Sequence, residues 1–321
     1  MKKYSRKLWC VLLVGPWLIM QAHAQWQSDY YQDHPLVGKI YATAKKQWIS
    51  EEALHNEIHH TRILLLGETH TNPDHHIGQA NLIHQWMPAD RHAALVMEML
   101  TYDEWHPYTH KEMSTEDLKE KLDELAGVWK WHLYEPLVQL KQDHQLPMVG
   151  ANLTREQRSH YSSDEHCQLT RQGREFEFCQ LMDEAQQGQI KQLIFDAHCD
   201  YLPYEHTGPL MNTQIAKDAS FALSLSNVAT THKAVLIAGA VHVRKDIGVP
   251  VHLQALGESS ISVAFINVDP DIVDPEEYIE QSDPGQSLNS QFDYVYFTPS
   301  ERNLDPCVEF AEQLKKMKKA Q

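Results

Sequence analysis

The stretch that decides the fold reads Ile63-Leu64-Leu65-Leu66-Gly67-Glu68-Thr69-His70. Four consecutive apolar residues are typical of a strand that is buried on both faces, as the strands of a parallel sheet are. The run ends at a glycine, a carboxylate and an imidazole, and the last two can bind a ligand or move a proton. In an open parallel sheet, ligands bind outside the carboxyl ends of the strands. The stretch therefore predicts a parallel sheet with a functional cleft at that end.

Three further apolar runs end in the same way. They are Ala94–Met97 before Glu98, Pro147–Ala151 before Asn152, and Ala234–Ala238 before Gly239 and His242. Helical patterns separate these runs, which predicts an α/β fold: a mainly parallel, doubly wound sheet flanked by helices. Later runs at 261–268 and 292–298 predict two more strands, and the short last one could lie antiparallel at an edge.

The spacing of these patterns divides the chain. Residues 25–60 form a lead-in segment, with a short hairpin near 39–48 and a helix capped by Ser50. Asn72 and Pro73 predict the start of another helix. Residues 61–300 form the α/β domain, in which about 101–145 is a helical insertion subdomain and 155–227 is again helical. Residues 301–321 form a C-terminal helical tail.

The first 24 residues have the pattern of a secretory signal peptide. A basic head precedes an apolar run from Leu8 to Met20, and Ala22-His23-Ala24 provides a small-x-small cleavage site. The run is too short to span a membrane. Cys10 lies inside the run, so a lipid anchor is not expected. We therefore expect a periplasmic or secreted protein that begins near Gln25.

Net charge and cysteine content limit the kinds of partner and the cellular compartment that we expect for the protein. After cleavage the chain carries 24 basic and 44 acidic residues, a net charge of −20 with histidines neutral, which opposes binding to nucleic acid. Twenty of the 21 histidines remain. An even number of cysteines in an exported chain predicts one or two disulfides among Cys167, Cys179, Cys199 and Cys307. Cys167 and Cys179 close the shortest loop, and the pairing is otherwise open.

Glu68, His70, Glu98 and His242 form the candidate site. Two imidazoles and two carboxylates from neighbouring strand ends suit zinc, manganese or iron better than calcium or magnesium. The same four residues could catalyse hydrolysis, with a glutamate as general base. Taken alone, each of these residues is explained more simply by a structural role as a polar group that caps a strand end. Only the convergence of all four in space would indicate a functional site. Arg155 could pair with a carboxylate or with an acid at its own helix start.

Several motifs together resemble the ChaN family of haem-binding uptake proteins in the Tiki/TraB-like superfamily. The resemblance covers about residues 60–268 and rests on motifs spread over that range. They are Leu66-Gly67-Glu68-Thr69-His70, His75-His76 with Gln79, Met97-Glu98-Met99, Trp129-x-x-His132-x-Tyr134, Asn152 with Arg155, Gln214 with Asp218, and Ala238-Gly239-Ala240-Val241-His242-Val243-Arg244.

The resemblance implies a haem-binding protein that acts in haem or iron uptake, with haem bound through a tyrosine at a dimer contact. Haem or an iron complex, a second copy of the chain, and outer-membrane or periplasmic uptake components would be its partners. Five tyrosines lie in predicted helical parts: Tyr102, Tyr108, Tyr134, Tyr201 and Tyr204. Of these, Tyr102 and Tyr134 are the candidate cofactor-binding residues, together with Arg155. The wider superfamily implies the alternative, a metal-dependent esterase or peptidase that uses Glu68, His70, Glu98 and His242.

Overall fold

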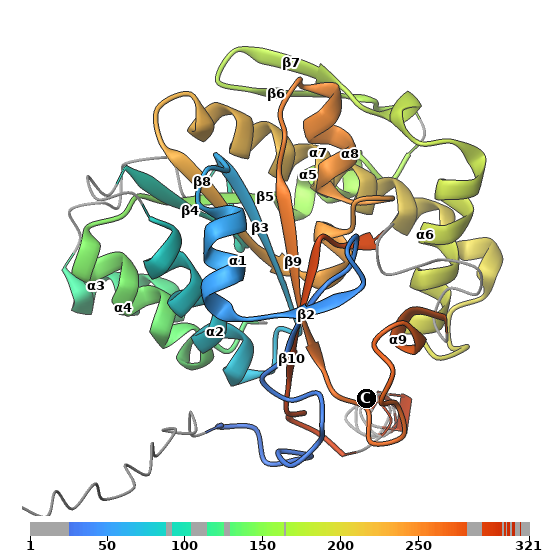
Figure 1. Cartoon of the computed structure of the whole chain (residues 1–321). Helices are drawn as coiled ribbons and strands as arrows, with labels where there is room; N and C mark the ends of the chain where they lie inside the picture. The colour runs from blue at the N-terminus through green and yellow to red at the C-terminus, as the bar shows by residue number, and fades with distance from the viewer. Residues whose placement is uncertain are drawn as a thin grey trace, which may run out of the picture.

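The computed structural model describes residues 26–311 and 315, apart from 88–91, 104–113, 125–128, 164, 281–290, 304, 306 and 309 (Figure 1). The predicted signal peptide, its cleavage site at Ala24, Tyr108 and much of the C-terminal tail lie outside these residues. No helix within the described part of the chain is long and apolar enough to cross a membrane.

An eight-stranded sheet runs through the molecule in the order β2-β1-β10-β9-β3-β8-β4-β5. Neighbouring strands from β10 to β5 are parallel, whereas β1 pairs antiparallel both with β10 and with the edge strand β2. The strands are β1 Ile40–Ala42, β2 Gln47–Ile49, β3 Ile63–Glu68, β4 Ala93–Thr101, β5 Met148–Asn152, β8 Lys233–Gly239, β9 Ile261–Asn267 and β10 Tyr294–Thr298. The predicted fold class and the predicted hairpin are therefore confirmed.

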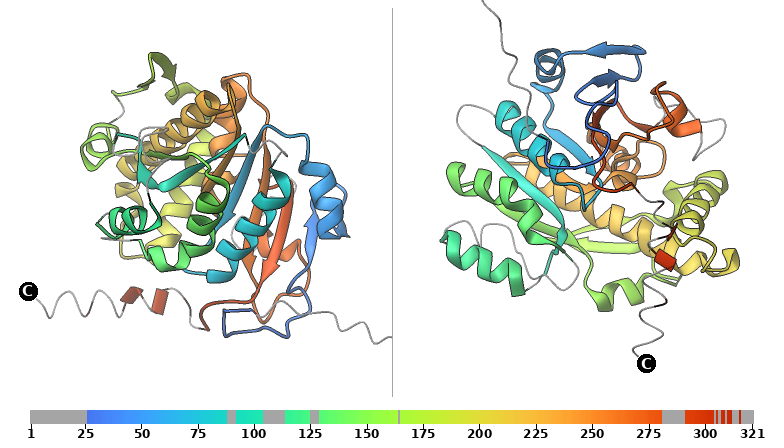
Figure 2. Two further views of the ribbon diagram at one scale, coloured as in Figure 1. Left: turned by 90° about the vertical axis from the view of Figure 1, so that its left-hand side faces the viewer. Right: turned by 90° about the horizontal axis from the view of Figure 1, so that it is seen from below.

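Helices cover both faces of this sheet, so that the strands form the middle of three layers (Figure 2). Alternate residues of β3 pack on opposite sides. Leu64 and Leu66 face helices α1 (Glu51–Ile58), α2 (Pro73–Trp86) and α4 (Glu135–His144), whereas Ile63 and Leu65 face α7 (Gly208–Ala229) and α8 (Val249–Ala255). Helix α6 (Glu184–Ala197) and a hairpin of β6 (Gln168–Arg171) and β7 (Arg174–Glu177) pack on the outer side of α7. All six residues of β3 are buried, as the unbroken apolar run predicts.

The helices begin where their caps predict. Ser50 accepts a hydrogen bond from the Ala53 amide at the start of α1, and Asn72 accepts one from the Asp74 amide at the start of α2. The helices are α1 Glu51–Ile58, α2 Pro73–Trp86, α3 Thr115–Glu124, α4 Glu135–His144, α5 Arg155–His160, α6 Glu184–Ala197, α7 Gly208–Ala229, α8 Val249–Ala255 and α9 Glu277–Glu280. Short 3₁₀ turns include η1 Trp131–Tyr134, η2 Cys179–Leu181, η3 Tyr204–His206 and η4 Ala240–Val243.

Two details of the predicted fold are wrong. The last strand, β10, is parallel to β9 and lies inside the sheet, because β1 covers its other side. Residues 155–227 are not all helical, since β6 Gln168–Arg171 and β7 Arg174–Glu177 form an antiparallel hairpin within them. Gln172 and Gly173 turn this hairpin with φ values of 50° and 76°, the left-handed geometry of a tight hairpin turn.

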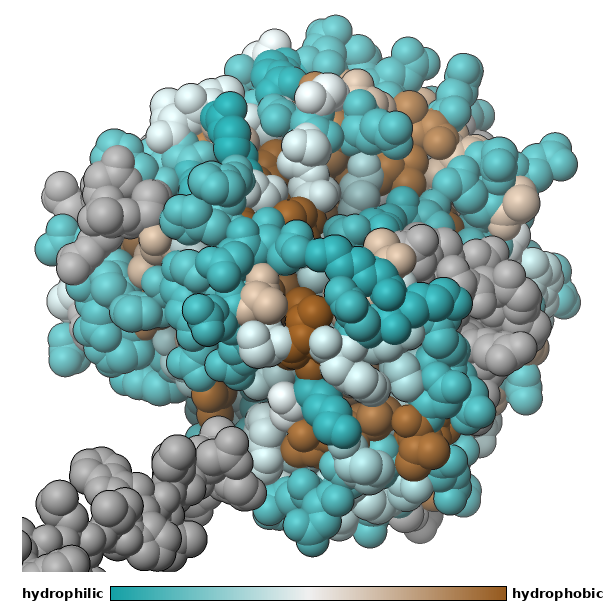
Figure 3. Space-filling model, viewed as in Figure 1, coloured by the Kyte–Doolittle hydropathy of each residue, from teal (hydrophilic) through white to brown (hydrophobic). Residues whose placement is uncertain are grey.

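Two disulfides join the four described cysteines. Cys167–Cys179 spans the base of the β6–β7 hairpin, and Cys199–Cys307 ties the C-terminal segment to the end of α6. The first is the pair with the shortest loop. The face of the molecule seen in Figure 3 is mainly hydrophilic, with small hydrophobic areas scattered over it.

Candidate functional site

Glu98 lies within β4 and does not end it, contrary to the prediction. Strand β4 continues to Thr101, and its pairing with β5 changes register between Met97 and Thr101. Such an irregularity re-aims side chains and is common beside functional sites. The Asn152 side chain donates to the Glu98 carbonyl at 2.8 Å and accepts from the Leu153 amide, which holds this part of the strand in place.

His242 arrives from η4, directly after β8. The close approach of η4 to β3 depends on Gly67, because a Cβ there would lie 2.4 Å from Val243 and 2.8 Å from the Ala240 backbone. With Gly67 in place, η4 packs against the end of β3, and the two halves of the site meet. The structure therefore brings Glu68, His70, Glu98 and His242 together at the carboxyl ends of β3, β4 and β8.

The first half, which we term the Glu68 cluster, contains Glu68, His70, His76 and Tyr134. One Glu68 oxygen accepts from His70 Nδ1 at 2.8 Å and from the Tyr134 hydroxyl at 2.6 Å. The other oxygen lies 3.4 Å from His76 Nε2. His76 is fully buried and packs against the Tyr134 ring, with ring centres 4.1 Å apart. Helix α2 thus supplies His76, which belongs to the motifs of the family resemblance, to the site.

The second half, the Glu98 cluster, contains Glu98, Lys217, Asp218 and His242. Glu98 Oε1 accepts from Lys217 Nζ at 2.8 Å and lies 3.1 Å from His242 Nε2, while Oε2 accepts from the Gly239 amide at 2.9 Å. His242 Nδ1 is hydrogen-bonded to Asp218. His70 Nε2 lies 3.7 Å from Glu98 Oε2 and links the two clusters.

Lys217 is the residue that sequence reasoning missed. It lies in the middle of α7, where a lysine normally points to water, yet its side chain is only 16% exposed. Lys217 and Asp218 lie three and four residues after Gln214, so both are on the same side of the helix as Gln214. All three contact His242 or Glu98. That spacing was the signal available in the sequence, although only Gln214 and Asp218 belong to the motifs quoted above.

The electrostatics follow from burial and from these partners. Burial alone would raise the pKa of Glu98, but the charges of His242 and Lys217 outweigh it and lower the pKa well below its usual value. Burial alone would lower the pKa of His242, but Glu98 and Asp218 outweigh it and raise the pKa to about 9. The pKa of His70 is also raised, since its bond to Glu68 and the charge of Glu98 overcome burial.

These contacts do not support the predicted metal site. The Lys217 ammonium lies between Glu98 and His242, where a metal shared by those two residues would have to sit. Three carboxylates already face Lys217 and three histidines, and a protonated imidazole cannot ligate a metal. Within the residues that the structure describes, no group of three or more His, Cys, Asp or Glu is arranged to hold a metal ion. The divalent-metal interpretation is therefore not supported.

The predicted cofactor-binding residues lie in three different settings. Tyr134 is fully buried, with its hydroxyl bound to Glu68. Tyr102 follows the end of β4 and is half-buried, with the Arg171 guanidinium stacked 4.0 Å from the centre of its ring. Arg155 is exposed at the start of α5. Only Tyr134 belongs to either cluster.

The model of the haem-binding uptake family ChaN, of the Tiki superfamily, matches residues 54–253. The chain belongs to the ChaN family. Among solved structures, it is similar to ChaN of Campylobacter jejuni, described as binding haem cofacially, with 22% identity, a TM-score of 0.61, and coverage of 80% of this chain and 95% of that one. At that identity the similarity of the two structures shows a shared fold.

Two other solved structures are more distant. They are the type III effector HopBA1, with 12% identity and a TM-score of 0.40, and an erythromycin esterase mutant in its open conformation, with 13% identity and a TM-score of 0.46. Each match covers 78% of this chain and 93% of the other. No curated protein matches the chain in sequence.

The raised pKa of His242 predicts how the stability of this ChaN-family protein depends on pH. Protonated His242 stabilises the fold fully below the unfolded-state pKa of about 6.5 and loses that contribution as the pH rises through about 9. We therefore expect the free energy of unfolding, from urea titrations, to fall by a few kcal/mol between pH 6.5 and pH 10. His242→Gln has no such titration and should show a flatter profile. Parallel profiles for the two proteins would contradict the assignment.

Proposed function

We propose that this protein is exported and binds haem at the carboxyl edge of its sheet, as part of haem or iron uptake. The observation that carries the proposal is the ChaN family match, which covers the strands and helices that build the site. Haem is large, flat and amphipathic, and its two propionates are anionic. A site for it needs an iron ligand, apolar or aromatic surface and a cation.

Tyr102 fits the role of iron ligand better than Tyr134. Tyrosine ligates haem iron through its oxygen as a phenolate. Burial and the nearby Glu68 carboxylate raise the pKa of Tyr134, and its hydroxyl already donates to Glu68. The Tyr134 phenol is therefore held in its protonated form, and its burial keeps it from contacting a bound haem. Tyr102 is half-buried just after the end of β4. The Arg171 guanidinium over its ring places positive charge beside the phenolate that would bind the iron.

The surroundings of the two clusters supply the other features. His70 keeps 34% of its side chain exposed and meets the edge of Trp129, with ring centres 4.9 Å apart. Val241 of η4, beside His242, is 41% exposed, which places an apolar side chain next to the Glu98 cluster. Arg155 is exposed and remains a candidate for contact with a propionate.

Export and assembly belong to the same proposal. The signal-peptide pattern of residues 1–24 and two disulfides among the described cysteines support a periplasmic or secreted location. The Campylobacter relative binds haem cofacially. By analogy, we propose that two copies of this chain dimerise around haem and pass it to outer-membrane or periplasmic uptake components.

Haemin titration of the chain from residue 25 tests this function. We expect a shifted Soret band in the wild type, and at least about tenfold weaker binding with an altered spectrum in Tyr102→Phe, because the oxygen ligand is lost. Tyr134→Phe is the matched control and should keep the wild-type spectrum. Light scattering with and without haemin tests the dimer.

The possible outcomes separate the parts of the proposal. A wild-type protein that leaves the haemin spectrum unchanged would exclude haem binding. Haem binding that is lost in Tyr134→Phe and kept in Tyr102→Phe would overturn the choice of ligand and leave the function standing.

A second candidate function is hydrolysis without a metal. The observation that favours it is the Glu98 cluster, whose buried, hydrogen-bonded acid and imidazole have shifted pKa values of the kind found in active sites. An esterase and peptidase screen of the wild type and His242→Ala tests it. Activity that is present in the wild type and lost in the variant would support hydrolysis, whereas a wild type without activity would remove this candidate.

A further inference from the structure

Histidines gather at the end of the sheet opposite the candidate site. His59 and His60 come just before β3, His92 immediately precedes β4, and His232 immediately precedes β8. Because these strands are parallel neighbours, their amino ends meet at one edge. The two clusters of the candidate site lie at the carboxyl edge, so neither uses these imidazoles.

Several of these histidines lie in pairs. Ring centres are 5.5 Å apart for His55 and His59, 4.9 Å for His59 and His60, and 5.6 Å for His92 and His232. Two imidazoles that bind one metal, each at about 2.0–2.1 Å, have ring centres roughly 5 Å apart. The first of these pairs is the best defined, because His55 and His59 are four residues apart at the end of α1 and so lie on one helix face.

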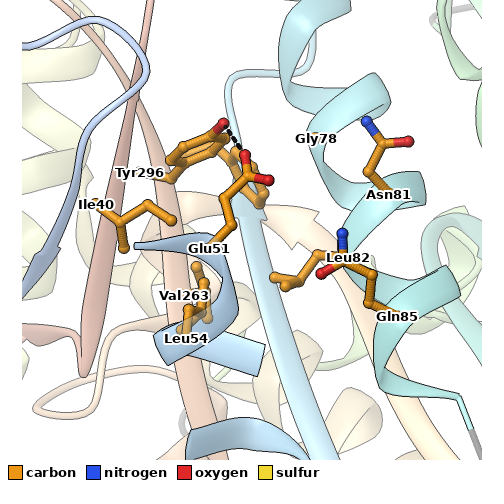
Figure 4. A pocket seen from close by; sticks show the side chains of 10 residues that line it. Ile40, Glu51, Leu54, Gly78, Asn81, Leu82, Gln85, Val263 and Tyr296 are labelled. Atoms are coloured by element: carbon orange, nitrogen blue, oxygen red, sulfur yellow. Dashed lines mark hydrogen bonds between the residues drawn. The ribbon is translucent and has the colours of Figure 1, made fainter. Parts of the chain in front are cut away.

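The surroundings orient this pair. His55 Nε2 donates to the Gln85 carbonyl of α2 at 2.9 Å, which leaves Nδ1 as the nitrogen able to bind a metal. Figure 4 shows Gln85 on α2 beside α1, across a cavity of about 40 Å³ that is too small for an organic ligand. His59 is exposed directly after α1, so its ring is accessible to a dissolved ion.

The charges near the pair permit a cation. One positive group near the pair, the Lys233 ammonium, donates to the carbonyls of His59 and Trp86 and lies 4.9 Å from the Trp86 ring, which holds it against the protein. The chain as a whole is strongly acidic and attracts cations.

We propose that His55 and His59 chelate a divalent transition-metal ion at the amino edge of the sheet, with Cu²⁺ bound most tightly. Neutral imidazoles suit such ions, and Cu²⁺ stands at the top of the affinity order for a given nitrogen site. Water completes the coordination, because the pair supplies two ligands only. The site is separate from the haem-binding function and does not depend on it.

Calorimetric titration of the chain from residue 25 with Cu²⁺, together with electron paramagnetic resonance, tests this site. We expect one bound Cu²⁺ with two imidazole nitrogens in the wild type. His59→Ala should weaken that site at least about tenfold, because the second imidazole is no longer held beside the first. Combining it with Ala53→His keeps the number of histidines but puts the second one two positions from His55, where the two side chains face different directions on a helix, and should not restore binding.

The matched control is His206→Ala, which removes an exposed histidine of η3 and should leave the site unchanged. Equal Cu²⁺ affinity in the wild type and His59→Ala would overturn the proposal, as would restored binding in the double variant. A wild-type spectrum with a single nitrogen ligand would do the same. Circular dichroism of each variant distinguishes lost ligation from lost folding, and haemin titration of the same samples should be unaffected.

Discussion

Replacing Glu98 with alanine is expected to lower the free energy of unfolding by about 3–5 kcal/mol, the usual cost of leaving buried charged partners uncompensated. Glu98 is 3% exposed and is the anion that faces both Lys217 and His242. It also accepts from the Gly239 amide and so holds the end of β8 next to β4. Urea denaturation at pH 7 measures the loss.

A matched control separates burial from simple charge removal. Glu135 also pairs with a lysine, Lys119, but both side chains are about half exposed. Exposed ion pairs contribute about 0–1 kcal/mol, so Glu135→Ala should cost little. A loss below about 1 kcal/mol for Glu98→Ala would mean that the cluster is not held together by charge, contrary to the account above.

The second large effect is expected from Gly67→Ala. A Cβ at this position would overlap a Val243 methyl and the Ala240 backbone, so the new methyl must push η4 away from β3. Overpacking a tight core costs about 1–3 kcal/mol, and occasionally more when backbone has to move. Because η4 carries His242, the displacement should also flatten the pH profile of Gly67→Ala, so that it comes closer to the profile of His242→Gln.

Gly188→Ala serves as the control for this substitution. Gly188 lies in α6, and no atom lies within 4 Å of a Cβ built there. Alanine should stabilise that helix by about 0.5–1 kcal/mol relative to glycine. Thermal and urea unfolding should therefore show a lower stability than the wild type for Gly67→Ala and a higher one for Gly188→Ala. Equal behaviour would show that the contact between β3 and η4 is looser than the structure indicates.

The sheet was predictable because its physical signal is local. A strand buried on both faces must be apolar at every position, and each of the four runs that begin the sequence analysis forms one. The polar residues Ser50 and Asn72 likewise predict helix starts through their own side chains.

The β6–β7 hairpin was not predictable in the same way. Its residues are largely polar and its strands alternate between exposed and buried positions, so no apolar run marks it. Its local signal is the turn at Gln172 and Gly173, flanked by the two bonded cysteines. The position of β10 depends on its neighbours β1 and β9, and neither neighbour can be read from the strand itself.

The sequence predicts which four residues meet at the site, but not which charged groups neutralise one another there. Parallel strand ends converge by topology, which is why Glu68, His70, Glu98 and His242 could be grouped from sequence. Lys217 comes from the middle of a long helix, and whether it points to water or to Glu98 depends on how α7 lies on the sheet. Without Lys217 the same four residues look like metal ligands.

The bond between Cys199 and Cys307 has a consequence for biosynthesis. It closes a loop of 108 residues that contains β8, β9 and β10. Because Cys307 follows all three strands, the bond can form only after β8, β9 and β10 have been synthesised. Expression in a reducing cytosol should therefore yield a molecule in which Cys307 is not tied to the end of α6, and limited proteolysis near Cys307 would distinguish the two forms.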